Sequence, residues 1–217
     1  MLNLILCQSM FLNSKIKNTV KSMGINVFYK NHMSSTNDYI NYKYITDDSP
    51  ILILTNNQRN PRGQRGSLWI NHQFHSFSFT LCLKLPGKIV DYENLSMVVG
   101  LSILESCKKF GVNHLRLKPP NDIIENNRKV CGILIENILT EDKYFYSAIG
   151  IGFNISIPEH LLNLIEGQAG NISINPKDLE KLMPEMIKSI ILCSSQLKKG
   201  GFNQFRKSYN KNKYVRT

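Results

Sequence analysis

The stretch of residues 118–136, KPPNDIIENNRKVCGILIE, carries the features from which we predict the fold. Its first residue, Lys118, is also the last residue of HLRLK, which predicts a short strand. Pro119 and Pro120 end that strand, because proline removes a backbone donor. After the polar ENNR break comes a β-branched run over residues 130–139, and a second run covers residues 144–155 after TEDK. Such runs between short polar breaks are typical of neighbouring strands. We therefore predict an antiparallel meander here.

The segments on either side of the meander show further strand and helix patterns. Residues 51–55 are a short apolar run that predicts a buried strand. In residues 77–85 apolar and polar side chains alternate, which predicts a strand with one face buried. Apolar residues at helical spacing predict helices over residues 93–110 and 177–197, with Pro184 either kinking the second or marking its start. The sequence therefore predicts an α+β protein with a mixed, largely antiparallel sheet flanked by helices.

Composition limits the class of protein. The chain has 217 residues, 42% of them hydrophobic, and a formal net charge of +11, which suits one sizeable core and an anionic partner such as a nucleotide. No apolar run reaches the roughly 18 residues that a membrane-spanning helix needs, so we expect no membrane partner. The basic residues form no dense arginine stripe with interleaved aromatics. Nucleic-acid binding therefore rests on charge alone, and we expect no specific nucleic-acid partner.

The cysteines and the N-terminus bear on the compartment. Five scattered cysteines without a CxxC pair favour reduced thiols over a disulfide framework or a zinc site. The start, MLNLILCQSMFLNSKIK, lacks the basic region of a secretory signal, although no acid precedes Asp38, as in an organellar leader. Residues 14–33 predict a helix and then a strand, which argues against cleavage there. We therefore expect a cytoplasmic protein.

Three polar segments lie at predicted strand ends or in loops, where rigid elements aim side chains at a ligand. They are SSTN at residues 34–37, the loop of residues 58–69, and residues 118–136. Taken alone, each favours a structural explanation: STN as a helix N-cap, the basic glycine loop as a solvated turn, and Arg128 with Lys129 as surface charge. Their order and spacing in one chain favour a ligand site.

In this order the segments resemble the biotin protein ligase family, whose catalytic domain has STN, a GRGRRG-type loop followed by Trp, K-W-P-N-D with R-K-x-x-G-I-L-x-E, and G-x-G-x-N. The matching residues are Ser35 to Asn37, Gln58 with Arg62 to Gly66 and Trp69, Lys118 to Asp122, Arg128 to Glu136, and Gly150 to Asn154. The resemblance implies a class II synthetase-like catalytic domain over residues 1–200 and a basic tail over residues 201–217. The family's N-terminal DNA-binding domain and C-terminal β-barrel are not indicated.

The resemblance also implies an activity and its substrates. Biotin and ATP would give biotinyl-AMP with Mg²⁺, and biotin would then pass to a lysine of a biotin carboxyl carrier domain. It assigns the catalytic role to Lys129 and Arg62. The implied biotin-binding residues are Ser35, Thr36, Asn37, Gln58, Arg62, Gly63, Gln64, Lys129, Gly132, Leu134 and Gly150. The implied ATP and adenylate residues are Arg65, Gly66, Trp69, Asn121, Asp122 and Asn154, with Asp122 also a candidate Mg²⁺ ligand.

Elementary chemistry agrees with these roles. Joining a carboxylate to an α-phosphate brings two anions together, which requires fixed cations and backbone donors. Lys129 and Arg62 carry suitable charge, and Gly63 and Gly66 allow close backbone approach. The ureido ring of biotin is a neutral donor and acceptor, to which hydroxyl and amide side chains are suited.

Three departures from the family pattern and three alternative functions remain. Pro61 stands where the family's phosphate loop opens with Gly, Gln64 replaces an arginine that holds the adenylate, and Pro119 replaces Trp. The alternatives are lipoate or octanoate transfer on the same fold, a catalytically weak biotin- or nucleotide-binding protein, and nucleic-acid binding. A homodimer is left open.

Overall fold

A computed structural model describes residues 14–39, 48–67, 69, 75–139, 143–165 and 168–215. The strands are β1 (Asn26–Met33), β2 (Ile51–Gln58), β3 (Ser76–Pro86), β4 (Arg116–Lys118), β5 (Asp122–Glu125), β6 (Arg128–Leu139) and β7 (Tyr144–Asn154). The α-helices are α2 (Ser14–Ser22), α3 (Leu95–Lys108), α4 (Glu159–Leu162), α5 (Leu179–Gly200) and α6 (Arg206–Asn212). The 3₁₀ helices are η1 (Asn37–Tyr39), η3 (Gln64–Gly66), η4 (Ile89–Tyr92), η5 (Pro176–Asp178) and η6 (Phe202–Phe205).

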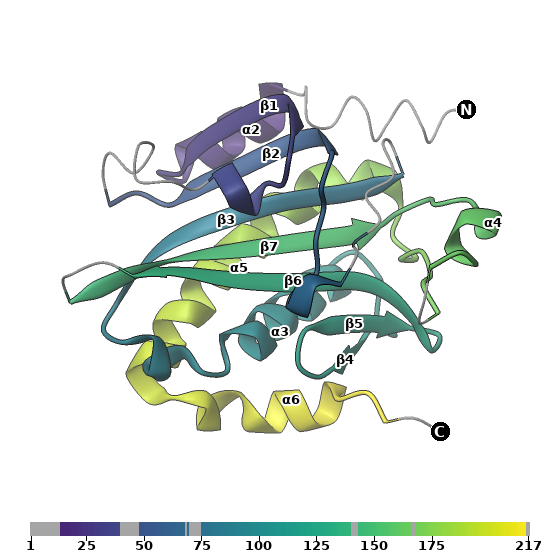
Figure 1. Ribbon diagram of the computed structural model, residues 1–217. Helices are drawn as coiled ribbons and strands as arrows, with labels where there is room; N and C mark the ends of the chain where they lie inside the picture. Colours follow the sequence, from purple (N-terminus) through teal and green to yellow (C-terminus); the bar gives the residue numbers. More distant parts are fainter. Residues whose placement is uncertain are drawn as a thin grey trace.

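The strands form one seven-stranded sheet in the order β1-β2-β3-β7-β6-β5-β4 (Figure 1). Only β1 and β2 pair in parallel, and every other neighbouring pair is antiparallel. The predicted α+β class with a mixed, largely antiparallel sheet is therefore confirmed. The helix and strand expected over residues 14–33 and the meander of β6 and β7 are also present.

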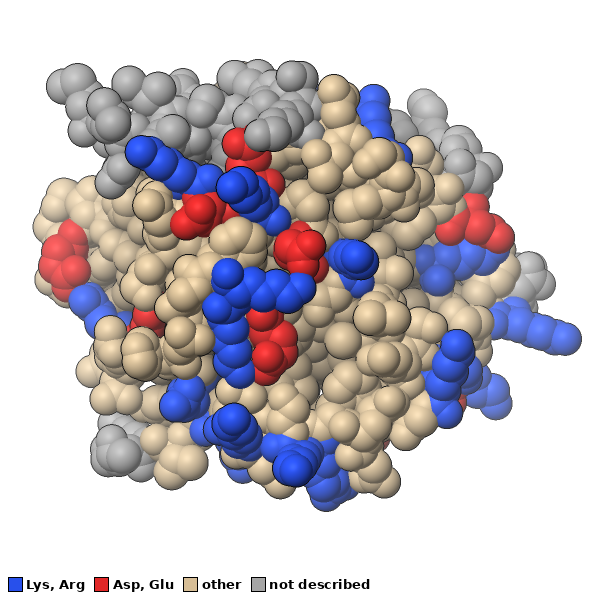
Figure 2. All heavy atoms as spheres, turned by 180° about the vertical axis from the view of Figure 1, so that it is seen from behind, with Lys and Arg blue, Asp and Glu red and all other residues tan. Residues whose placement is uncertain are grey.

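Helices α3 and α5 lie together behind the sheet in the view of Figure 1. Their buried side chains and those of the sheet form the main hydrophobic core of the protein. Val98 and Leu104 of α3 and Met183 and Ile187 of α5 are fully buried in this core. Each such side chain stabilises the fold by about 1.5–3 kcal/mol relative to its exposed state. Seen from the helical side, acidic side chains lie among the basic ones over the middle of the surface, whereas the lower edge in this view is mainly basic (Figure 2). Because α3 and α5 cover one face of the sheet, its opposite face can be covered by other segments of the chain.

The alternating residues 77–85 do form β3, but the prediction that only one of its faces is buried was wrong. Ser78 and Thr80, on the side away from the main core, are 5% and 0% exposed. β3 is an inner strand, and the SSTN segment and the segment after β2 cover this second face (Figure 1). Farther along, Cys82 packs with Ile53 in a second apolar cluster. Small polar side chains at a strand's second face can thus line a covered site.

Two other elements differ from the sequence prediction. β5 was missed because its four residues, DIIE, lie between polar segments and form too short an apolar run. The last long helix, α5, begins at Leu179, so Pro184 lies inside it and does not mark its start. The chain enters α5 through η5, where the side chain of Asn175 accepts a hydrogen bond from the backbone of Lys177 at 3.0 Å.

The segment after Gly200 is helical in its described part. Tyr209 of α6 is buried in the main core, and the backbone N–H of Tyr214 donates to the carbonyl of Leu117 at 2.7 Å. Residues 1–13, which include Cys7 and the leader-like start, lie outside the described residues. Cys82, Cys107 and Cys131 are buried free thiols, and burial raises the pKa of Cys82 to about 12. Among the described helices none combines the length and the apolar character needed to cross a bilayer.

Candidate active site

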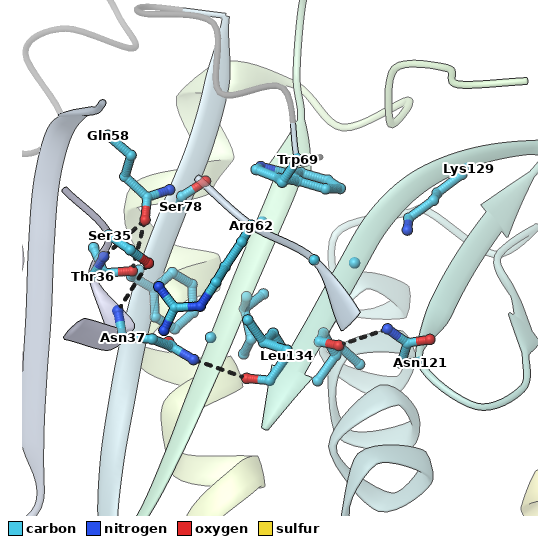
Figure 3. Close-up of a pocket in the computed structure, with 17 residues that line it drawn as sticks. Ser35, Thr36, Asn37, Gln58, Arg62, Trp69, Ser78, Asn121, Lys129 and Leu134 are labelled. Atoms are coloured by element: carbon cyan, nitrogen blue, oxygen red, sulfur yellow. Dashed lines mark hydrogen bonds between the residues drawn. The ribbon is translucent and has the colours of Figure 1, made fainter. Parts of the chain in front are cut away.

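A pocket lies on the sheet face away from α3 and α5, between the sheet, the SSTN segment and the segment after β2 (Figure 3). It contains about 430 Å³ of empty space, part of it open to solvent. The predicted site residues that line it are Ser35, Thr36, Asn37, Gln58, Arg62, Gly63, Trp69, Asn121, Lys129, Gly132, Leu134 and Gly150. Gln64, Arg65, Gly66, Asp122 and Asn154 are not among its lining residues. The segments that lie apart in the sequence therefore meet at one cavity.

One end of the pocket is a buried network of neutral polar groups. Gln58 accepts hydrogen bonds at its side-chain oxygen from the backbone N–H of Thr36 at 2.8 Å and from the Thr36 hydroxyl at 3.2 Å. Thr80 Oγ1 lies 2.8 Å from Thr36 Oγ1 and 2.6 Å from Asn37 Oδ1. Thr80 and the lining residue Ser78 were not predicted, because their alternation suggested only an outward strand face. This end suits a neutral ligand that both donates and accepts.

The floor of the pocket depends on glycines that lie beside one another in the sheet. Gly150 of β7 pairs with Thr80 and with Leu134, and a Cβ atom there would lie 2.5 Å from Asn37 Oδ1. Gly152, two residues on and on the same face, pairs with Gly132. A Cβ at Gly152 would lie 2.6 Å from the Trp69 ring. The two glycines of the GIG sequence thus provide space for Asn37 and for Trp69 respectively.

Lys129 points into the pocket because of a β-bulge between β5 and β6. Opposite Ile123 and Ile124 stand Cys131 and Lys129, so Val130 is the extra residue. Val130 and Cys131 are both buried in the main core, whereas Gly132 and Lys129 line the pocket. Strict alternation from Gly132 would have put Val130 in the pocket and Lys129 in the core. The irregularity therefore delivers a lysine to the site.

The ammonium group of Lys129 has two neighbours. Its Nζ lies 2.6 Å from Oδ1 of Asp122 and 5.5 Å from the centre of the Trp69 ring. The backbone of Lys129 is fixed separately, since its N–H donates to the carbonyl of Gln168 and its carbonyl accepts from Gly170. The side chain of Asn154 donates to the carbonyls of Lys129 and Gly170, at 3.4 and 3.1 Å. Asn154 thus holds the strand that carries Lys129 and does not line the cavity.

Arg62 is held by two carboxylates. Its Nε and Nη2 donate to Glu136 Oε1 at 3.3 and 3.0 Å, and its Nη2 also donates to Oε2 at 2.8 Å. Its Nη1 lies 2.5 Å from Oδ1 of Asp38. Partial burial disfavours the charge, but hydrogen bonds to Glu136 and Asp38 outweigh it and raise the pKa of the guanidinium. The partnership with Asp38 and Glu136 spans too much sequence to be predicted from local spacing.

The loop after Pro61 turns through η3 at the mouth of the pocket. Gly63 N–H donates to the carbonyl of Ser67 at 2.7 Å, and the Gln64 carbonyl accepts from the hydroxyl of Ser67 at 2.9 Å. Arg65 has a positive φ of 57°, and the side chains of Gln64 and Arg65 are exposed. Backbone contacts therefore fix this turn, and both side chains remain free of the cavity wall.

Comparison with known proteins gives the family. Residues 29–154, more than half of the chain, match the biotin/lipoate A/B protein ligase family. The chain belongs to this family. The matched range ends at Asn154 and includes every predicted site residue, from Ser35 onward.

Individual relatives agree with the biotin/lipoate ligase family. The chain is 27% identical over 172 residues to biotin--protein ligase 2 of Arabidopsis thaliana, covering 68% of this chain and 51% of that protein. It is 27% identical over 125 residues to the bifunctional ligase/repressor BirA of Escherichia coli, covering 58% of this chain and 39% of that protein. The chain thus spans about two fifths to half the length of these relatives.

Solved structures share the fold. The biotin protein ligase from Aquifex aeolicus in complex with biotin and ATP superposes with a TM-score of 0.65 at 22% identity, covering 87% of this chain and 78% of that one. The biotin protein ligase from Leishmania major in complex with biotinyl-5-AMP gives a TM-score of 0.60 at 20% identity, covering 88% and 83%. The fold of this chain is therefore that of a biotin protein ligase catalytic domain.

Proposed function

We propose that this chain is an ATP-dependent biotin protein ligase. A carboxylate oxygen of biotin attacks the α-phosphorus of ATP, and the bond to the β-phosphate breaks to release pyrophosphate. The lysine amine of a biotin carboxyl carrier domain then attacks the carbonyl carbon of biotinyl-AMP. An amide bond forms, AMP leaves, and the amine loses a proton. The family and the relatives' names support the reaction class.

The observation that carries the proposal is the order of chemical groups along the pocket. A buried neutral polar end with Thr36 and Gln58 is followed by a glycine floor at Gly150 and then by the ammonium of Lys129. Biotin has the matching sequence of groups: a ureido ring, an apolar ring and chain, and a carboxylate. Each neutral hydrogen bond that matches contributes about 0.5–1.5 kcal/mol.

The same end of the pocket favours biotin over lipoate. The dithiolane ring of lipoate has no N–H or carbonyl group to pair with the network of Thr36, Asn37 and Gln58. Each hydrogen bond that the ureido ring of biotin adds to this network contributes about 0.5–1.5 kcal/mol, and lipoate cannot form these bonds. Lipoate or octanoate transfer therefore remains the weaker candidate on this fold.

Lys129 is the residue we assign to the activation step. The biotin carboxylate and the α-phosphate repel each other, and a fixed ammonium beside both stabilises the charge that develops as they join. Arg62 already has two carboxylate partners, Asp38 and Glu136. We therefore propose that Arg62 holds the wall of the site and that Lys129 is the main residue that stabilises the negative charge of the phosphate.

The site offers one carboxylate, that of Asp122, as a candidate ligand for Mg²⁺ bound to the nucleotide phosphates. No group of three or more metal-binding side chains occurs within the described residues, but Mg²⁺ in nucleotide sites needs only one or two carboxylates beside phosphate oxygens and water. Asp122, next to Lys129, is such a carboxylate. The ion, when bound, would neutralise phosphate charge. A carrier domain as partner and a cytoplasmic location are part of the same proposal.

Transfer of labelled biotin tests the function. The full chain is incubated with ATP, Mg²⁺, labelled biotin and a purified carrier domain, and covalent label on the carrier is measured. A matched reaction with lipoate and calorimetry with a short oligonucleotide address the two other ligand classes. Biotin binding without turnover would favour the catalytically weak binding protein.

The aromatic ring of Trp69 provides a first prediction. Trp69→Ala is expected to raise the KM for ATP about 2- to 13-fold, because stacking contributes about 0.5–1.5 kcal/mol beyond area burial. The Kd for biotin, measured by calorimetry, should change little. Trp69→Phe, which keeps a ring over Gly132 and Gly152, serves as the control. An equal loss of affinity for both ligands would show that Trp69 instead supports the pocket structurally.

The exposed side chain of Gln64 provides a second prediction. Gln64→Arg is expected to slow the loss of bound biotinyl-AMP about tenfold, the equivalent of about 1.4 kcal/mol, because arginine adds a permanent cation with planar donors. The turn should persist, since its bonds to Ser67 use the Gln64 backbone. The lifetime of the adenylate and the labelling of a bystander protein are measured for both chains. Equal lifetimes would mean that Arg59, Arg65 or the backbone already retains the adenylate.

A further inference from the structure

We propose that Glu136 is a positioning residue that orients the hydrogen-bonding groups of the biotin end of the pocket through Asn37. The inference rests on the proposed function, because it concerns how that site recognises its ligand. Glu136 itself is not among the residues that line the cavity.

The place of Glu136 in β6 puts its carboxylate beside the site. Gly132, Leu134 and Glu136 follow one another at every second position and so share a sheet face. Opposite Glu136 in β7 stands Ala148, a small residue in the second apolar cluster. The carboxylate can therefore reach over the sheet toward the SSTN segment, where Oε2 accepts from Asn37 Nδ2 at 2.7 Å.

This contact decides which way the Asn37 amide faces. The NH₂ group of Asn37 lies toward two groups that only accept, the Glu136 carboxylate and the carbonyl of Leu134, at 2.7 and 3.4 Å. Its oxygen consequently faces Thr80 Oγ1 at 2.6 Å. Because an amide has its donors and its acceptor on opposite sides, the charge of Glu136 fixes both.

The orientation passes on to the next hydroxyl groups. Asn37 Oδ1 can only accept, so Thr80 donates its single proton to it. Thr80 Oγ1 then presents lone pairs to Thr36, and the Thr36 hydroxyl proton is shared between Thr80 and the Gln58 oxygen. A ligand at this end therefore contacts hydroxyl and amide groups whose donor and acceptor orientations depend on the Glu136 carboxylate.

Asp38 offers an internal comparison. Both Asp38 and Glu136 form ion pairs with Arg62, at 2.5 and 2.8 Å, and both are partly exposed. Among the described contacts, Glu136 also accepts a hydrogen bond from the Asn37 side chain, whereas the Asp38 carboxylate contacts Arg62. Removing either charge weakens the grip on Arg62, whereas removing that of Glu136 also frees the Asn37 amide to turn. The two substitutions therefore separate the role in biotin recognition from the role in holding Arg62.

The test is a double-mutant cycle on biotin affinity, measured by calorimetry without ATP. Glu136→Gln and Asn37→Ala are each expected to weaken biotin binding at least tenfold. The double variant should be within threefold of Asn37→Ala alone, because Glu136 acts through Asn37. Asp38→Asn should change biotin affinity less than threefold. Glu185→Gln, which removes a surface ion pair with Lys109, is the control for loss of charge.

The outcomes separate this inference from the proposed function. If the natural chain binds no biotin, the proposed function fails. If it binds biotin, two results would overturn the positioning role. One is that the factors by which Glu136→Gln and Asn37→Ala weaken biotin binding multiply in the double variant. The other is that Asp38→Asn weakens biotin binding as much as Glu136→Gln. Should Glu136→Gln not fold, Glu136→Asp replaces it, because it retains the charge on a shorter side chain. Glu136→Asp should then bind biotin with an affinity between those of the natural chain and Asn37→Ala. The double variant Glu136→Asp with Asn37→Ala should bind biotin no more weakly than Asn37→Ala alone.

Discussion

Lys129→Ala is expected to lower the rate of pyrophosphate release by about 10²- to 10³-fold while leaving the protein folded. Removing one preorganised group that stabilises transition-state charge costs rates of this order. Lys129 is the cationic end of the pocket, and its side chain makes no part of the apolar core. Its backbone bonds to Gln168 and Gly170 do not depend on the side chain. Pyrophosphate release with biotin and ATP measures the step directly.

Two further variants make this result interpretable. Lys109→Ala removes a lysine of similar ion pairing, with Glu185, but lies outside the pocket, so its activity should equal that of the natural chain. Asp122→Asn removes the carboxylate that pairs with Lys129 and reports whether this pairing sets the position of the ammonium. Thermal unfolding of each variant checks the fold. Pyrophosphate release by Lys129→Ala at the natural rate would exclude Lys129 from the activation step.

The order of strands and helices could be predicted from the sequence because hydrophobic periodicity reports local burial. The run in β6 and the alternation in β3 are of this kind. Periodicity could not show that Ser78 and Thr80 would be covered, since the residues that cover them are distant in the sequence: residues 35–37, Gln58, Arg62, Gly63 and Trp69. A four-residue strand such as β5 gives too few positions for either period to be recognised.

In the candidate site, too, the residue identities could be predicted from the sequence, whereas the contacts between distant segments could not. The STN, loop and RKVCGILIE motifs predicted most residues that line the pocket, because family resemblance carries residue identity in order along the chain. It could not supply the bulge at Val130, which reverses the alternation of β6 and turns Lys129 toward the pocket. Nor could it supply the pairing of Arg62 with Asp38 and Glu136, because 74 positions separate Arg62 from Glu136.

Gly150→Ala is expected to weaken biotin binding about 100-fold. The new Cβ would lie 2.5 Å from Asn37 Oδ1, a distance that real Cβ contacts essentially never show. Asn37 cannot shift without breaking its bonds to Glu136 and Thr80, at 2.7 and 2.6 Å. Loss of such a buried hydrogen-bonded arrangement costs about 1–3 kcal/mol for each group left unpaired, and about 1.4 kcal/mol corresponds to tenfold in affinity. Calorimetry with biotin in the absence of ATP measures the change.

Ile149→Val supplies the matched control on the same strand. Ile149 is fully buried on the opposite face of β7, in the main core, so the shorter side chain should lower the free energy of unfolding by about 0.5–1.5 kcal/mol and leave biotin affinity unchanged. Gly150→Ala should show the reverse pattern, a large loss of affinity with a smaller change in stability. A Gly150→Ala chain that binds biotin as tightly as the natural one would mean that Asn37 moves aside freely. The glycine would then not determine the position of Asn37, and the biotin end of the pocket would have to be sought elsewhere along the SSTN segment.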